Sequence, residues 1–102
     1  MDVILDIRIG SPTYGQCATV ALSGTNFKGV YLPTGVAHGF CVLEDDTTMI
    51  YLTSTMHAPT ADAGIRFDSF GFDWPIKAAT HSDRDLEFED FSSLDSPFIF
   101  SE

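Results

Sequence analysis

Hydrophobic and polar residues alternate strictly at the start of the chain. Apolar side chains occupy every second position from residue 3 to residue 9, and residues 2, 4, 6 and 8 face the opposite way. This period of two predicts a β-strand over residues 2–9 with one apolar face. The Gly-Ser-Pro string at residues 10–12 ends the strand, because proline fixes φ in a turn.

Several later segments have the composition of extended chain. β-branched, aromatic or apolar residues dominate residues 14–22, 29–32, 37–43 and 47–55, and Gly, Pro or acidic strings separate them. Residues 83–88 predict either one helical turn or a solvated ending. About five short strands at a spacing of roughly 8–12 residues predict an all-β fold, a sandwich or barrel of jelly-roll type.

The length allows one domain. A chain of 102 residues and 11.2 kDa would expose about 5,700 Å² when folded, against about 16,000 Å² when open, so about 65% of its surface is buried and only a modest core forms. We expect the jelly roll to span residues 1–90. Residues 91–102 are expected to form an acidic tail.

Charge and hydropathy exclude several classes of protein. Fifteen acidic residues against five basic ones give a net charge of −10, which argues against nucleic acid or an anionic membrane as partners. The apolar runs are far shorter than the ~20 residues of a membrane span. We expect a cytoplasmic protein in which Cys17 and Cys41 are two buried thiols.

Five strings occur in a specific order. They are Asp-Ile-Arg at 6–8 followed by Gly-Ser-Pro-Thr-Tyr-Gly at 10–15; Leu-Ser at 22–23; Leu-Pro-x-Gly-x-Ala-His-Gly-Phe at 32–40; Tyr51; and Gly-Ile-Arg-Phe at 64–67 leading to Gly-Phe-Asp-Trp-Pro at 71–75. In this order and spacing the chain resembles the dTDP-4-dehydrorhamnose 3,5-epimerase family of cupin-fold enzymes. The resemblance runs from about residue 2 to residue 85 and implies a cupin-type jelly roll shortened at its N-terminus.

The resemblance also implies a cofactor-free chemistry. A base removes a proton next to the C4 ketone of a dTDP-sugar, a donor stabilises the enolate, and an acid returns a proton on the other face. In the family the base is the His of an Arg-Gly-Leu-His string, and a Lys stabilises the enolate. Both lie in a portion that precedes the matched strings, so this chain resembles the C-terminal part of such an enzyme.

Three residues are the catalytic candidates. Tyr51 matches the family's acid, although a tyrosine in an alternating strand is usually a core residue. Asp85 matches the Asp that orients the catalytic His, and an exposed acid in an acidic tail is the alternative. His38 matches a pocket histidine and is the best substitute base, whereas a hydrogen-bonded structural role is the alternative.

The substrate-binding candidates come from the same resemblance and from the small number of basic residues that could bind a diphosphate. Asp2 matches an acid on the first strand, where we expect it to neighbour His38. The diphosphate of a nucleotide sugar requires cationic partners. The predicted substrate-binding residues are Asp2, Arg8, Lys28, His57 and Arg66.

Three functions stay open on the sequence alone. The first is a compact dTDP-sugar epimerase of reduced activity, or one half of a split one whose base and Lys come from a partner polypeptide. The second is a non-catalytic cupin that binds a sugar nucleotide or assembles with a partner, and the third is a small metal-binding cupin. No metal ligand is assigned, since the spacing of the histidines gives no positive signal. A shortened sheet leaves an open edge, so we expect a homodimer that covers the edge of the strand at residues 2–9 or 14–22.

Overall fold

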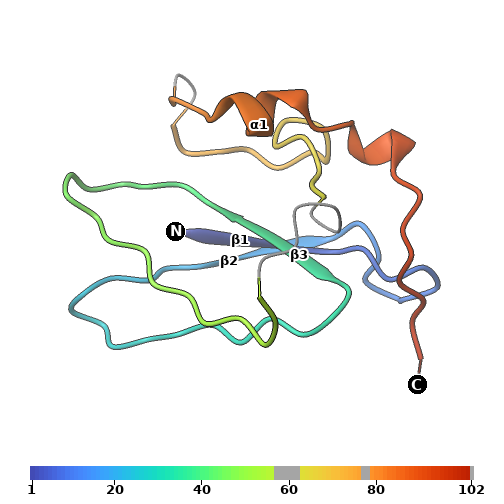
Figure 1. Cartoon of the computed structure of the whole chain (residues 1–102), viewed down its shortest axis with the longest axis horizontal. Helices are drawn as coiled ribbons and strands as arrows, with labels where there is room; N and C mark the ends of the chain where they lie inside the picture. Colours follow the sequence, from blue (N-terminus) through green and yellow to red (C-terminus); the bar gives the residue numbers. More distant parts are fainter. Residues whose placement is uncertain (57–62, 77–78, 102) are drawn as a thin grey trace.

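A computed structural model describes residues 1–56, 63–76 and 79–101. Its centre is an antiparallel sheet of three strands, β1 (Asp2–Asp6), β2 (Cys17–Val20) and β3 (Val36–Phe40), in the order β2-β1-β3. The helical elements are α1 (Asp83–Glu87) and the 3-10 turn η2 (Phe91–Ser93). Figure 1 shows the sheet with α1 along one side of it. The chain is therefore all-β with little helix.

The alternating pattern of the first segment produces the central strand. Residues Val3 and Leu5 of β1 are 2% and 3% exposed, and Ile7 beyond the strand is also buried. Their neighbours Asp2 and Asp6, on the other face, are buried as well. Both faces of β1 are thus covered at its ends, which the simple alternation of apolar and polar residues did not predict.

The Trp74 side chain lies over the sheet face that carries Val3. That residue pairs with Gly39 of β3, and a Cβ added at Gly39 would lie 3.7 Å from Cη2 of Trp74. The Trp74 indole N–H donates to the carbonyl of Phe67 at 2.8 Å, which fixes the ring over the sheet. Asp2 and His38 lie on the opposite face, because side chains alternate along paired strands.

Some predicted elements form and others do not. The predicted strands at residues 2–9 and 14–22 contain β1 and β2, and the one at 37–43 overlaps β3, which begins one residue earlier and ends at Phe40. The helical turn at residues 83–88 is confirmed as α1, with Ser82 as its N-cap. The strands predicted at 29–32 and 47–55 are wrong, since both segments are irregular. A β-prone sequence forms a strand only where a neighbouring strand supplies hydrogen bonds.

Two further expectations are corrected. The segment at residues 2–9 was expected to offer an open sheet edge, but β1 is the central strand and pairs on both sides. Cys41 is buried as predicted, whereas Cys17 is exposed, because it begins an edge strand whose residues are little covered. Both thiols are free.

The core is thin for a chain of this size. Among the described residues, the buried apolar side chains are Val3, Leu5, Ile7 and Cys41. The chain exposes 7943 Å², about 2,200 Å² more than the roughly 5,700 Å² that scaling predicts for a folded monomer of its mass. Much of this excess is apolar, since large side chains at 27, 31, 50, 52 and 56 are between 84% and 96% exposed.

Candidate functional site

The sheet brings Asp2 and His38 together. Asp2 pairs with Phe40 across β1 and β3, so His38 lies diagonally opposite it on the same face. The Nδ1 atom of His38 lies 3.3 Å from Oδ1 of Asp2. The side chain of Asp2 is 6% exposed and that of His38 is 37% exposed. The expected proximity of these two residues is confirmed.

This arrangement gives the imidazole a defined chemical role. When Nδ1–H donates to the buried Asp2 carboxylate, the proton is held on Nδ1 and the lone pair lies on Nε2. Because the His38 side chain is only partly buried, part of the ring is open to a molecule on this face of the sheet. A histidine oriented by a carboxylate in this way can accept a proton as a general base.

Arg8 is engaged by a second carboxylate, Asp6. Its Nε donates to Oδ1 of Asp6 and its Nη2 to Oδ2, both at 2.9 Å, and its backbone N–H donates to Oδ1 at 3.0 Å. The hydroxyls of Ser11 and Thr13 each donate to Oδ2 at 2.6 Å. We name these four residues the Asp6 cluster. It fixes the turn that follows β1.

The Asp6 cluster shifts the proton equilibria of its charged members. Hydrogen bonds from the Arg8 guanidinium, and then from Ser11 and Thr13, hold the pKa of the Asp6 carboxyl well below its usual range, although burial acts in the opposite direction. The hydrogen bond to Asp6 raises the pKa of Arg8. Arg8 was predicted to bind phosphate, and here its fork is directed at Asp6.

Arg66 contacts α1, the helix that carries Asp85, but bonds to the carbonyl of Leu86. The Nη1 atom of Arg66 donates to the carbonyl of Leu86 in α1 at 2.6 Å, and its Nε donates to Asp68 at 2.8 Å. Asp85 lies in the first turn of α1, where its backbone N–H donates to Ser82 Oγ at 3.1 Å. The structure thus places Arg66 as a link between residues 66–68 and the helix.

The other candidates lie apart from these groups. Tyr51 is 66% exposed in the irregular segment 41–56, and its hydroxyl makes no hydrogen bond to another described residue. Lys28 is exposed in the loop between β2 and β3, where its backbone N–H donates to Asn26 Oδ1 at 3.2 Å. His57 lies outside the described residues.

Comparison with known proteins decides the family. The family model described as dTDP-4-dehydrorhamnose 3,5-epimerase matches residues 1–93. The chain belongs to this family. It is 40% identical over 87 residues to the dTDP-4-dehydrorhamnose 3,5-epimerase of Mycolicibacterium smegmatis, covering 84% of this chain and 43% of the relative. It is 36% identical over 96 residues to that of Shigella flexneri, covering 92% and 53%.

A third relative carries a narrower name. The dTDP-4-dehydrorhamnose 3-epimerase of Streptomyces niveus is 37% identical over 88 residues, which cover 84% of this chain and 42% of the relative. The chain spans about half the length of these curated relatives. Membership of the dTDP-4-dehydrorhamnose 3,5-epimerase family, predicted from the five strings, is confirmed.

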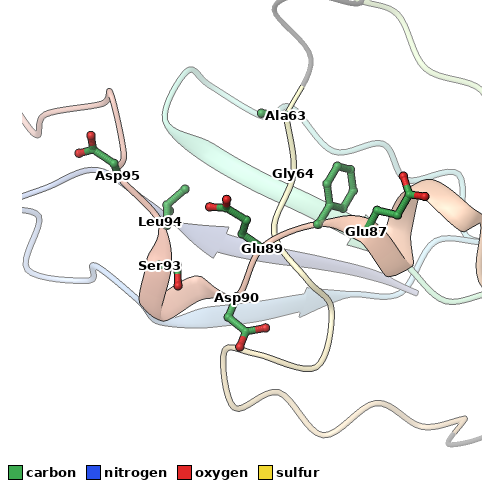
Figure 2. A pocket seen from close by; sticks show the side chains of 9 residues that line it. Ala63, Gly64, Glu87, Glu89, Asp90, Ser93, Leu94 and Asp95 are labelled. Carbon is green, nitrogen blue, oxygen red and sulfur yellow. The ribbon is translucent and has the colours of Figure 1, made fainter.

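One hollow in the described part of this family member does not coincide with the predicted site. It measures about 420 Å³ and is lined by Ala63, Gly64, Glu87, Phe88, Glu89, Asp90, Ser93, Leu94 and Asp95. Figure 2 shows its carboxylates spread along the chain from α1 to beyond η2. A concentration of carboxylates repels the diphosphate of a nucleotide sugar, so we do not assign the substrate to this hollow.

Metal and membrane chemistry find no support in the described residues. Within residues 1–56, 63–76 and 79–101, no three His, Cys, Asp or Glu side chains gather closely enough to hold a metal ion. Over the same ranges, the helices are too short or too polar to cross a bilayer.

The sequence analysis missed the role of Asp6. A signal for it was present, because Asp6 is followed by an arginine two positions later and by Ser11 and Thr13 in the adjacent turn. Hydroxyl and guanidinium donors at such spacings can converge on one carboxylate when the chain turns back. The prediction treated this string only as a mark of family kinship.

Proposed function

We propose that this chain forms part of the active site of a dTDP-4-dehydro-6-deoxy-sugar 3,5-epimerase with a cupin-type jelly roll. Membership of the family supports the reaction class. The observation that carries the proposal is the hydrogen-bonded pair of His38 and Asp2 on the more open face of the sheet. Nothing else in the described residues pairs an accessible imidazole with a buried carboxylate.

The pair suits the chemistry of a 4-keto sugar. The ketone at C4 acidifies the hydrogens at C3 and C5, so a base of ordinary strength can remove one of them. The Nε2 atom of His38 would accept that proton while Asp2 stabilises the resulting imidazolium. The proton returns on the opposite face of the ring, which inverts the carbon, and no cofactor takes part.

The remaining groups would come from a further polypeptide segment. The 102 residues contain no Arg-Gly-Leu-His string, and the chain spans about half of its relatives. We propose that a segment equivalent to the other half supplies the enolate-stabilising Lys, with His38 as the base, Tyr51 as the acid and Asp85 as an orienting carboxylate. The exposed position of Tyr51 leaves it free to join such an assembly.

The exposed apolar surface supports association. Phe27, Tyr31 and Leu52 are 92%, 88% and 96% exposed, and a large exposed apolar area is typical of a surface that packs against a partner. We propose that a homodimer, or the segment just described, covers this surface and the open edge of β2. Light scattering at micromolar concentration tests this proposal, and a monodisperse monomer without such a segment contradicts the homodimer.

A second function is favoured by the lack of a complete catalytic set. Loss of the group that stabilises an enolate lowers a rate by ~10²–10³, so a chain that acts alone would bind a sugar nucleotide with little turnover. In that case dTDP raises the melting temperature, since a ligand at 100 times its Kd stabilises by ~2.7 kcal/mol. Binding without proton exchange is the result that distinguishes this second function.

Solvent isotope exchange tests the catalytic proposal. In deuterium oxide, the chain together with a polypeptide that carries the Arg-Gly-Leu-His portion, with Gln in place of its His, should introduce deuterium at C3 and C5 of a dTDP-4-keto-6-deoxy sugar, measured by mass spectrometry. His38→Gln should slow the exchange by ~10²-fold or more. His81→Gln is the matched control, because that ring stacks on Phe67. Equal rates for both variants would contradict the assignment of His38.

A further inference from the structure

The C-terminal segment is docked beside the end of the central strand. We name residues 96–100 the C-terminal strap. The family model matches residues 1–93, so the strap follows the matched region. Figure 1 shows this part of the chain, in dark red, passing close to the N-terminal segment beyond β1. The contacts between the two segments are specific and come from both backbone and side chains.

Backbone pairing joins the strap to Ile9. The N–H of Ile9 donates to the carbonyl of Phe98 at 2.8 Å, and the N–H of Phe100 donates to the carbonyl of Ile9 at 2.9 Å. Ile9 and Ile99 therefore form a parallel bridge. Both backbone groups of Ile9 are satisfied by the strap, as in the addition of a strand to a sheet edge.

Side chains define the register of this pairing. Ser96 is 6% exposed, and its hydroxyl donates to the carbonyl of Ile7. Phe98 approaches Gly35, where an added Cβ would lie 3.5 Å from Cβ of Phe98. The ring of Phe100 lies 5.1 Å from the guanidinium carbon of Arg8. Every second residue of the strap thus faces the body of the protein, whereas Ile99 between them is 77% exposed.

We propose that residues 7–9, together with Gly35, form a strand-addition site whose ligand is the strap, held there in cis. The ligand class is an extended apolar peptide with a serine two residues before its first aromatic side chain. Alternate side chains give such a site its specificity, and the backbone of Ile9 gives it affinity. The site lies outside the Asp2–His38 pair, so the proposal does not depend on the proposed function.

Competition in the full chain tests this site. The probe is a fluorescently labelled synthetic peptide of residues 95–101, followed by fluorescence anisotropy. The wild-type chain should bind it weakly, because a tethered ligand has an effective concentration in the millimolar range. Ser96→Ala/Phe98→Ala weakens the strap in cis and should bind the probe at least ~10-fold more tightly. Ile99→Ala, the matched control, should behave as the wild type.

Three results would overturn the proposal. One is a folded Ser96→Ala/Phe98→Ala chain that binds no more probe than the wild type. Another is equal binding of a peptide with alanine at positions 96 and 98. The last is hydrogen exchange of the Ile9 and Phe100 amides in the wild type at the rate of an unstructured peptide, which decides the question even where the double variant fails to fold.

Discussion

Replacement of Asp6 by asparagine is expected to be among the most destabilising conservative changes in this chain. The carboxylate accepts five hydrogen bonds, of which three reach Oδ2. Asparagine keeps the shape but places an NH₂ group at one of the two oxygens, so the donors there lose their acceptor. Removal of one partner from a buried charged pair costs about 3 kcal/mol, the lower end of the usual range because Arg8 can be rehydrated.

The size of this effect can be measured directly. A loss of about 3 kcal/mol should lower the melting temperature by roughly 12–24 °C for a domain of this length. Thermal unfolding at pH 7, followed by circular dichroism, gives the shift. Asp68→Asn is the matched control, because Asp68 also pairs with an arginine two positions away but its side chain is 49% exposed. An exposed pair contributes no more than about 1 kcal/mol.

The dependence on pH provides a second test of the same cluster. The pKa of Asp6 is lowered in the folded state, whereas an unfolded chain protonates an aspartate near about pH 3.9. The unfolded state therefore takes up the proton first, and the stabilisation present above that pH is lost as the pH falls toward the lowered pKa. The difference in stability between wild type and Asp6→Asn should shrink below about pH 4. A constant difference from pH 7 to pH 2.5, or equal effects of Asp6→Asn and Asp68→Asn, would refute the reasoning.

Two other predictions follow from backbone and thiol positions. Gly35→Ala should destabilise the chain by about 2 kcal/mol more than Gly10→Ala, measured by urea unfolding. Both glycines have positive φ, but only at Gly35 would a Cβ lie 2.5 Å from the side chain of Arg8. Equal destabilisation by the two substitutions would contradict this contact. Cys41 should react with an alkylating reagent at least ~10-fold more slowly than Cys17, because only Cys41 is buried. Peptide mass spectrometry measures both rates, and Cys17 should react like an accessible free thiol. Faster labelling of Cys41 would show that the sheet edge opens.

Local patterns predicted the parts of the fold that depend on one segment at a time. The alternation around Val3 and Leu5 predicted that a strand forms there with one buried face, although it did not predict that this strand is central. The resemblance to the family predicted that Asp2 and His38 are neighbours, and register across β1 and β3 places them together. The first prediction needed one segment only, and the second, which joins residues 36 apart, came from the resemblance to the family.

Features that depend on distant segments were not predicted. Residues 47–55 have the composition of a strand but no neighbouring strand, so they stay irregular. The Asp6 cluster requires a turn that brings Ser11 and Thr13 back to the strand. The strap requires pairing between residues 9 and 99. Sequence composition does not encode which distant segments meet, because closing such loops depends on the fold as a whole.

The central claim is that a sugar nucleotide binds on the sheet face that carries Asp2 and His38. Heteronuclear NMR during a titration with dTDP tests it directly, because Trp74 is the only tryptophan of the chain and its indole N–H reports on the opposite face. The account predicts saturable shifts of the His38 imidazole and amide with little change at Trp74. Shifts centred on Trp74, or none at His38 with millimolar dTDP, would contradict it.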